Sequence, residues 1–107
     1  MLRAGRLAHQ RSGVRYLEGI PPEQRPFVDI DQTFVDLTGR RFRPDVVNHL
    51  TGEVVEFKPQ SWKGVSRLER EARRQAASYA ARLNALYGDW RRLEGLPEYW
   101  WRVEYYR

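Results

Sequence analysis

The stretch that decides the fold is RPDVVNHLTGEVVEFKPQ, residues 43–60. Two short valine-rich runs lie on either side of a Leu-Thr-Gly turn, a pattern typical of a β-hairpin. Successive side chains of a strand point to opposite faces, so Val54, Glu56 and Lys58 are predicted to share one face. Asp45 lies on the neighbouring strand, close enough for its carboxylate to meet that of Glu56 across the hairpin.

This arrangement of charges predicts a specific chemistry. Two converging carboxylates repel each other unless a cation lies between them, and Mg²⁺ prefers oxygen ligands together with water and substrate phosphate. Such an ion polarises a phosphoryl group and lowers the pKa of a bound water, while Lys58 could orient that water or stabilise developing charge. The alternative is that Asp45 ends a turn and that Glu56 and Lys58 form an ion pair on a solvated face.

The rest of the chain predicts the other elements of a single α/β domain. The expected elements are a basic amphipathic helix at 2–18 broken at Ser12-Gly13, strands at 27–37, 40–49 and 53–58, a helix at 65–86 with Gly88 as its stop signal, and a closing strand within 98–107. Three antiparallel strands followed by a helical crossover to a fourth strand predict a mixed central sheet flanked by helices.

The composition favours a polyanionic partner. The 107 residues carry 19 Lys and Arg against 14 Asp and Glu, a formal charge of +5. Most of the excess is arginine, which binds phosphate in a fork, although a GC-rich genome would also raise the arginine content. The absence of cysteine excludes disulfides and thiolate metal sites, and the sequence shows no apolar run long enough to span a membrane and no secretory signal.

Pro44-Asp45, followed eleven positions after the aspartate by Glu56-Phe57-Lys58, resembles the signature of the PD-(D/E)xK, or restriction-endonuclease-like, nuclease superfamily. The predicted order of elements is similar to the αβββαβ core of that family. Gln75 and Tyr79, in QAASY, look like the Gln-x-x-x-Tyr element of its RecB-type branch. The chain is also similar to nuclease toxin domains at the ends of bacterial polymorphic toxins and secreted effectors.

The resemblance implies roles for individual residues. Asp45 and Glu56 would be ligands of Mg²⁺ or Mn²⁺, Lys58 the catalytic lysine, and Gln75 and Tyr79 supporting groups. The first helix of the family often adds a ligand, for which His9 and Glu18 are the candidates here.

The resemblance also implies a biological setting. The protein would be a DNase, as the toxin domain of a longer chain, acting in the cytoplasm of a target cell after delivery. An acidic cognate immunity protein would inhibit it. Two further functions stay open, an RNA-cleaving toxin and a non-catalytic nucleic-acid-binding module of the same fold.

Several other residues have two interpretations. The nucleic-acid-contacting arginines are predicted to be Arg43, Arg67, Arg70 and Arg74, the last three on a helix face that could equally be a solvated surface. Tyr79 could be a core residue with a satisfied hydroxyl. His49 is expected at the surface. The aspartates at 29, 31 and 36 are expected on the outward face of a strand, with one of them able to reach the metal. The tryptophans at 90, 100 and 101 are expected mainly in the core rather than stacked on bases.

Overall fold

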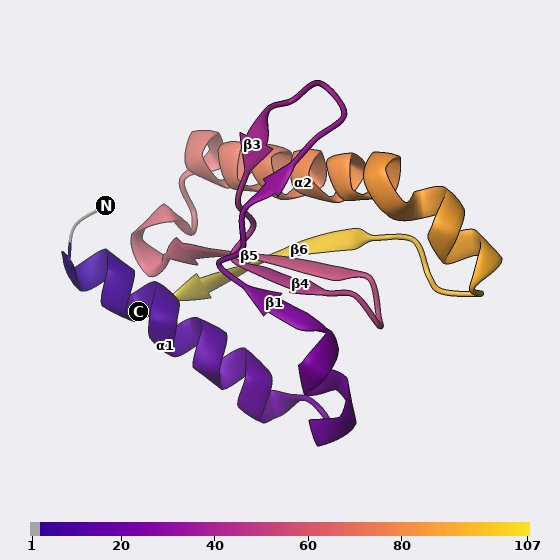
Figure 1. The fold of residues 1–107 in the computed structure, drawn as a ribbon. Helices are drawn as coiled ribbons and strands as arrows, with labels where there is room; N and C mark the ends of the chain where they lie inside the picture. Colours follow the sequence, from indigo (N-terminus) through magenta and orange to yellow (C-terminus); the bar gives the residue numbers. More distant parts are fainter. Residues whose placement is uncertain (1–2) are drawn as a thin grey trace.

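The computed structural model describes residues 3–107, with side chains from Leu7 onward. A central sheet lies between two helices, α1 (Arg3–Gly19) and α2 (Ser66–Leu93), which cover its opposite faces (Figure 1). In spatial order the sheet contains β1 (Val28–Ile30), β4 (Val46–Asn48), β5 (Glu53–Pro59) and β6 (Trp100–Tyr106). The first three strands are antiparallel and β6 runs parallel to β5. The predicted α/β fold, with a mixed sheet flanked by helices, is confirmed.

Strand β5 is the centre of the molecule because both of its faces are covered. Val55 and Phe57 pack with Tyr16 of α1, whereas Val54 packs with Leu83 of α2. Burying each of these apolar side chains stabilises the fold by about 1.5 to 3 kcal/mol. The long helix α2 is the crossover that a parallel β5–β6 pair requires.

Two of the predicted strands are divided in the structure. The strand expected at 27–37 stops after Ile30 because Asp31 takes a left-handed backbone conformation with φ +57°. The strand expected at 40–49 is interrupted at the buried Pro44, which has no N–H to donate to a sheet. The released segments β2 (Phe34–Val35) and β3 (Arg41–Phe42) pair as a separate two-stranded hairpin.

Helix α1 is continuous, so the predicted break at Ser12-Gly13 is wrong. A Cβ at Gly13 would lie 2.9 Å from Cγ2 of Ile30. The glycine therefore allows α1 to approach β1 closely, and its conformational freedom is not used.

Helix α2 passes through Gly88 and ends at Leu93, so the predicted stop at Gly88 is also wrong. The stop is Gly95, which has φ +72° and donates its N–H to the Arg92 carbonyl. A left-handed glycine just after the last turn is a common helix C-cap.

The turn between β4 and β5 requires its glycine. Gly52 has φ +81°, and a Cβ there would lie 2.4 Å from the Glu98 carbonyl oxygen. Its own carbonyl accepts the Trp100 N–H at 2.9 Å, so the turn also holds the start of β6.

His49 is not the surface residue that the sequence predicted. His49 is half-buried, with Nε2 2.7 Å from Oδ2 of Asp29 and Nδ1 2.7 Å from the Tyr99 hydroxyl. The expectation of core tryptophans is wrong as well, since Trp90 and Trp100 are 57% and 46% exposed. No helix within residues 3–107 has both the length and the apolar content of a membrane span.

Candidate active site

Asp45 and Glu56 are brought together by the register of β4 and β5. Val46 is paired with Val55, which places Asp45 beside Glu56. The Asp45 N–H donates to Oε1 of Glu56 at 2.8 Å, and the Phe57 N–H donates to Oδ2 of Asp45 at 2.8 Å. These two reciprocal bonds fix both carboxyl groups against the backbone.

Burial sets the protonation of Glu56. The residue is only 3% exposed, so it is not part of a solvated face. Burial, together with the nearby charge of Asp45, raises the pKa of Glu56 from 4.5 to about 9. Without a cation, the Glu56 carboxyl group is therefore mostly protonated at neutral pH.

The arrangement fits a small divalent cation. The hydrogen bonds of the described residues use Oε1 of Glu56 and Oδ2 of Asp45, which leaves the second oxygen of each carboxylate for a ligand. Within the described residues, no third His, Asp or Glu completes a ligand cluster with them. Mg²⁺ commonly binds through one or two carboxylates and keeps several waters.

Lys58 lies on the same face of β5 as Glu56 and lines the same pocket. Its Nζ is 5.0 Å from the centre of the Trp62 ring, a cation–π contact. Trp62 lies in the short 3₁₀ helix η2 (Gln60–Trp62) directly after β5, so it limits where the ammonium group can lie.

Gln75 and Tyr79 lie one turn apart on α2 and bind each other. Nε2 of Gln75 donates to the Tyr79 hydroxyl at 3.0 Å. Gln75 lines the pocket, whereas the Tyr79 ring stacks on Phe42 at 5.7 Å and belongs to the α2-side core. Burial and the charge of Glu56 raise the pKa of Tyr79, so its hydroxyl stays protonated and able to donate.

Of the two ligand candidates from the first helix, only His9 lines this pocket. Its Nδ1 is 3.6 Å from Oδ1 of Asp45. Glu18 instead lines a separate hollow of about 590 Å³ on the outer face of α1. Gln10 lines both hollows and therefore marks where they adjoin.

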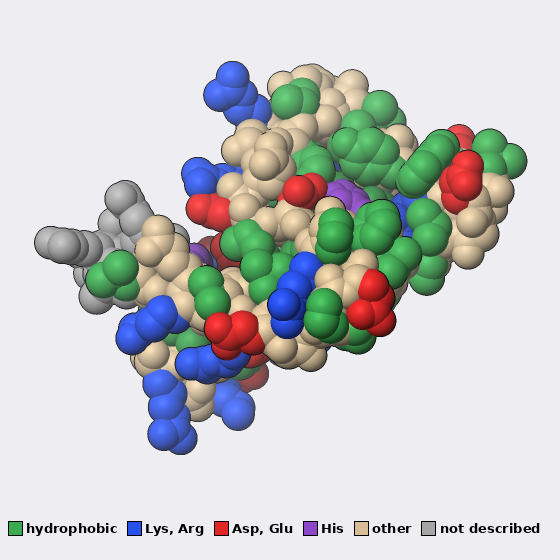
Figure 2. Space-filling view, turned by 60° about the horizontal axis from the view of Figure 1, so that its bottom comes forward, with side chains coloured by type: hydrophobic (Ala, Val, Ile, Leu, Met, Phe, Trp, Pro, Cys, Tyr) green, Lys and Arg blue, Asp and Glu red, His purple; other side chains and the backbone are tan. Residues whose placement is uncertain are grey.

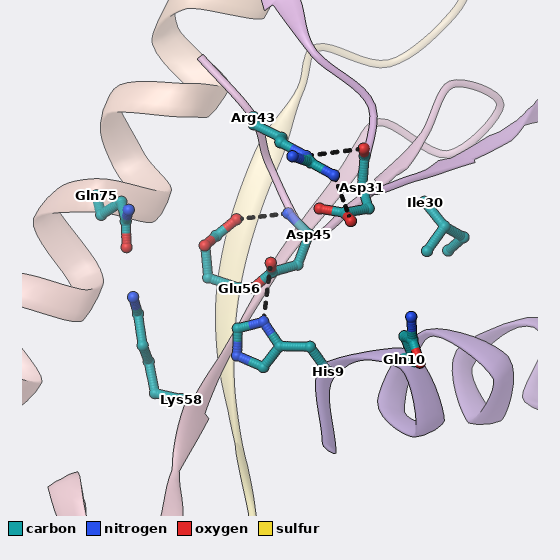
Figure 3. A pocket seen from close by; sticks show the side chains of 9 residues that line it. All are labelled: His9, Gln10, Ile30, Asp31, Arg43, Asp45, Glu56, Lys58 and Gln75. Atoms are coloured by element: carbon teal, nitrogen blue, oxygen red, sulfur yellow. Dashed lines mark hydrogen bonds and ion pairs between the residues drawn. The ribbon is translucent and has the colours of Figure 1, made fainter. Parts of the chain in front are cut away.

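The resulting pocket has a volume of about 580 Å³, and most of the residues that line it are polar or charged (Figure 3). Its residues are His9, Gln10, Ile30, Asp31, Arg43, Asp45, Glu56, Lys58 and Gln75. Figure 3 shows Asp45 and Glu56 between Arg43 on one side and Lys58 on the other. Strand β5, both helices, the end of β1 with the residue after it, and the connection between β3 and β4 all contribute to it.

The predicted nucleic-acid-contacting arginines separate into two groups. Arg43 lines the pocket, where it pairs with Asp31. The three on α2 are exposed and do not line the pocket: Arg67, Arg70 and Arg74. Helical geometry of about 100° per residue places Arg74 on the side of α2 away from the buried Ala76.

A basic surface lies over α1 (Figure 2), which the sequence predicted to be a basic helix without assigning it contacts to nucleic acid. Figure 2 shows Lys and Arg side chains gathered over this part of the molecule. Arg11 and Arg15 are exposed there, on either side of Val14, which is 54% exposed. This surface adjoins the pocket at Gln10.

Gln10 and Trp62 lie at the site, and neither was predicted from the sequence. Gln10 follows His9 and could have been found from that adjacency, and Trp62 from its position four residues after Lys58. No sequence pattern indicated the left-handed conformation of Asp31, which turns its side chain toward Arg43.

Comparison with protein-family models, curated proteins and solved structures finds no match for the chain.

Proposed function

We propose that the protein is a metal-dependent nuclease with a restriction-endonuclease-like core, and that Asp45, Glu56 and Lys58 form its active site. The supporting observation is the convergence of two carboxylates, one of them almost fully buried, in an accessible pocket next to a lysine. Burying a carboxyl group beside another one destabilises a small fold, and perturbed carboxyl groups of this kind cluster at functional sites.

The cofactor would be Mg²⁺ or Mn²⁺, held by Asp45 and Glu56. When bound, the ion supplies Lewis-acid stabilisation of a phosphoryl group and lowers the pKa of a water molecule. Lys58 contributes a positive charge that stabilises the phosphate oxygens as negative charge develops on them. Its contact with Trp62 reduces the conformational freedom that would be lost on binding.

The remaining pocket residues position these groups. Gln75 presents its amide to the pocket while its Nε2–H is held by the Tyr79 hydroxyl. His9 is near Oδ1 of Asp45 and orients this carboxylate from the side of α1. We assign Tyr79 a positioning role, because its ring is part of the core.

The substrate of this proposal is DNA. The net charge of +5 and the exposed arginines on α1 and α2 would attract a polyanion. A nuclease of this charge endangers the cell that makes it. We therefore propose a toxin domain that acts in the cytoplasm of a target cell and is held inactive in its producer by a small acidic immunity protein.

The test is to incubate the purified protein with supercoiled plasmid and, separately, with RNA, each with Mg²⁺ and with chelator. The proposal predicts plasmid cutting in Mg²⁺ and none in chelator. Cutting of RNA but not of plasmid would show that the substrate is RNA and not DNA. Binding of nucleic acid without cutting in Mg²⁺ or Mn²⁺ would refute the enzymatic role and leave a binding module of the same fold.

A further inference from the structure

Arg43 and Asp31 form a contact in the pocket that the proposed chemistry does not use. Nη2 of Arg43 lies 2.6 Å from Oδ2 of Asp31, and its Nε–H donates to the Asp31 carbonyl at 3.0 Å. Both residues line the pocket together with Asp45 (Figure 3). Two donors of one guanidinium group are therefore directed at a single residue.

The backbone holds Asp31 in this position. Its N–H donates to the Asp45 carbonyl at 2.9 Å, and its φ of +57° lies in the left-handed region. Asp and Asn are the non-glycine residues that accept this conformation most readily. The backbone of Asp31 is therefore held next to Arg43, and an Asn at this position would preserve it.

A ligand can displace the Asp31 carboxylate from Arg43. The fork of an arginine binds carboxylate and phosphate with the same geometry. Both side chains are largely exposed, 59% for Arg43 and 58% for Asp31. Exposed ion pairs are weak, and this one would change a competing equilibrium by no more than about fivefold.

We propose that Arg43 forms a phosphodiester-binding subsite and that the Asp31 carboxylate occupies this subsite until a phosphate displaces it. This inference rests on the proposed function, because it assigns the same pocket a phosphate ligand. Asp31 then acts as an internal competitor that lowers the affinity for every phosphate ligand. Its location beside Asp45 places the displaced carboxylate near the reacting groups, where its charge adds to the repulsion of the ligand.

The test is an NMR titration with diethyl phosphate, a phosphodiester monoanion, which requires no turnover. The Arg43 Nε–H signal is identified by its loss in Arg43→Lys, a variant that keeps the charge and removes the fork. Three proteins are titrated, namely the wild type, Asp31→Asn and the control Asp89→Asn. Asp89 is 96% exposed, forms an ion pair with Arg92 and lies near the end of α2, outside the pocket.

The expected result is that the ligand moves the Arg43 signal in the wild type and that Asp31→Asn binds up to about fivefold more tightly. Asp89→Asn should match the wild type. An unchanged or weaker affinity in Asp31→Asn, or an equal gain in Asp89→Asn, would overturn the inference, and so would an Arg43 signal that does not move. A protein that passes this titration but cuts no nucleic acid would keep the subsite and lose the nuclease proposal. A protein that cuts nucleic acid but fails the titration would keep the nuclease proposal and lose the subsite.

Discussion

The substitution Glu56→Gln probes the buried carboxyl group most sharply. Glutamine has nearly the same shape, keeps an oxygen to accept the Asp45 N–H, and is uncharged at every pH. In the wild type the folded state holds the Glu56 proton more tightly than the unfolded state, because its pKa is raised from 4.5 to about 9. The folded protein binds more protons than the unfolded chain between these values, so the free energy of unfolding falls as pH rises through this window.

The magnitude follows from the size of the shift. Full linkage changes the free energy of unfolding by about 1.4 kcal/mol per pH unit, so from about pH 6 to about pH 8 the Glu56 contribution falls by at most about 2.7 kcal/mol. For a chain of this size, 1 kcal/mol corresponds to about 4 °C in Tm. We therefore expect the Tm of the wild type, measured without metal, to fall by up to about 10 °C relative to Glu56→Gln over this range.

Thermal unfolding of both proteins in chelator, followed by circular dichroism across the same pH range, is the assay. Groups that titrate identically in the two proteins cancel in the difference between their curves. Below about pH 4.5 the Glu56 term should be absent, because the carboxyl group is then protonated in both states. Parallel curves for the wild type and Glu56→Gln would refute the reasoning, since they would show that Glu56 titrates normally in the folded state.

Three other predictions test the cofactor, the nucleic-acid surface and the partner. At pH 8, Mg²⁺ at about 100 times its Kd should raise the free energy of unfolding of the wild type by about 2.7 kcal/mol, and Glu56→Gln should gain much less; equal gains would place the ion elsewhere. The affinity for labelled DNA, measured by fluorescence, should fall with rising salt. Replacing Arg11 and Arg15 with alanine should reduce this salt dependence more than replacing Arg70 and Arg74, because the α1 surface adjoins the pocket. The opposite order would identify α2 as the contact surface. Co-expression with an acidic protein encoded by a neighbouring gene should restore the growth of cells that the wild type kills, and harmless expression of the wild type alone would contradict the toxin assignment.

The sequence was most informative where a local rule and the buried core agree. The alternation along 53–58 predicted which side chains of β5 share a face. The structure places Val54 in the core cluster on the α2 side and Val55 and Phe57 in the one on the α1 side, because both faces are buried and the register cannot slip without exposing them. The meeting of Asp45 and Glu56 follows from the same register. This part of the site could be predicted because one hairpin supplies both residues.

The parts that the sequence did not predict depend on contacts distant in the chain. Gly13 resembles a helix breaker in the sequence, but in the structure its missing side chain makes room for Ile30. Gly88 resembles a stop signal, although the helix continues to Leu93 and the capping glycine is Gly95. His49 bonds to Asp29 and Tyr99, which are 20 and 50 residues away from it. Alternation alone cannot show that Asp31 adopts a left-handed conformation, because that depends on its bonds to segments across the pocket.

The central claim is tested most directly by the rate of plasmid cutting in Mg²⁺ by Lys58→Ala, with Lys63→Ala as its matched control. These are the two lysines of the chain, five residues apart, and Lys58 lines the pocket while Lys63 is exposed outside it. The account predicts that Lys58→Ala reduces turnover by about 100-fold or more, with its Tm close to that of the wild type, and that Lys63→Ala cuts at the wild-type rate. Near wild-type cutting by Lys58→Ala, or an equal loss in both variants, would contradict it.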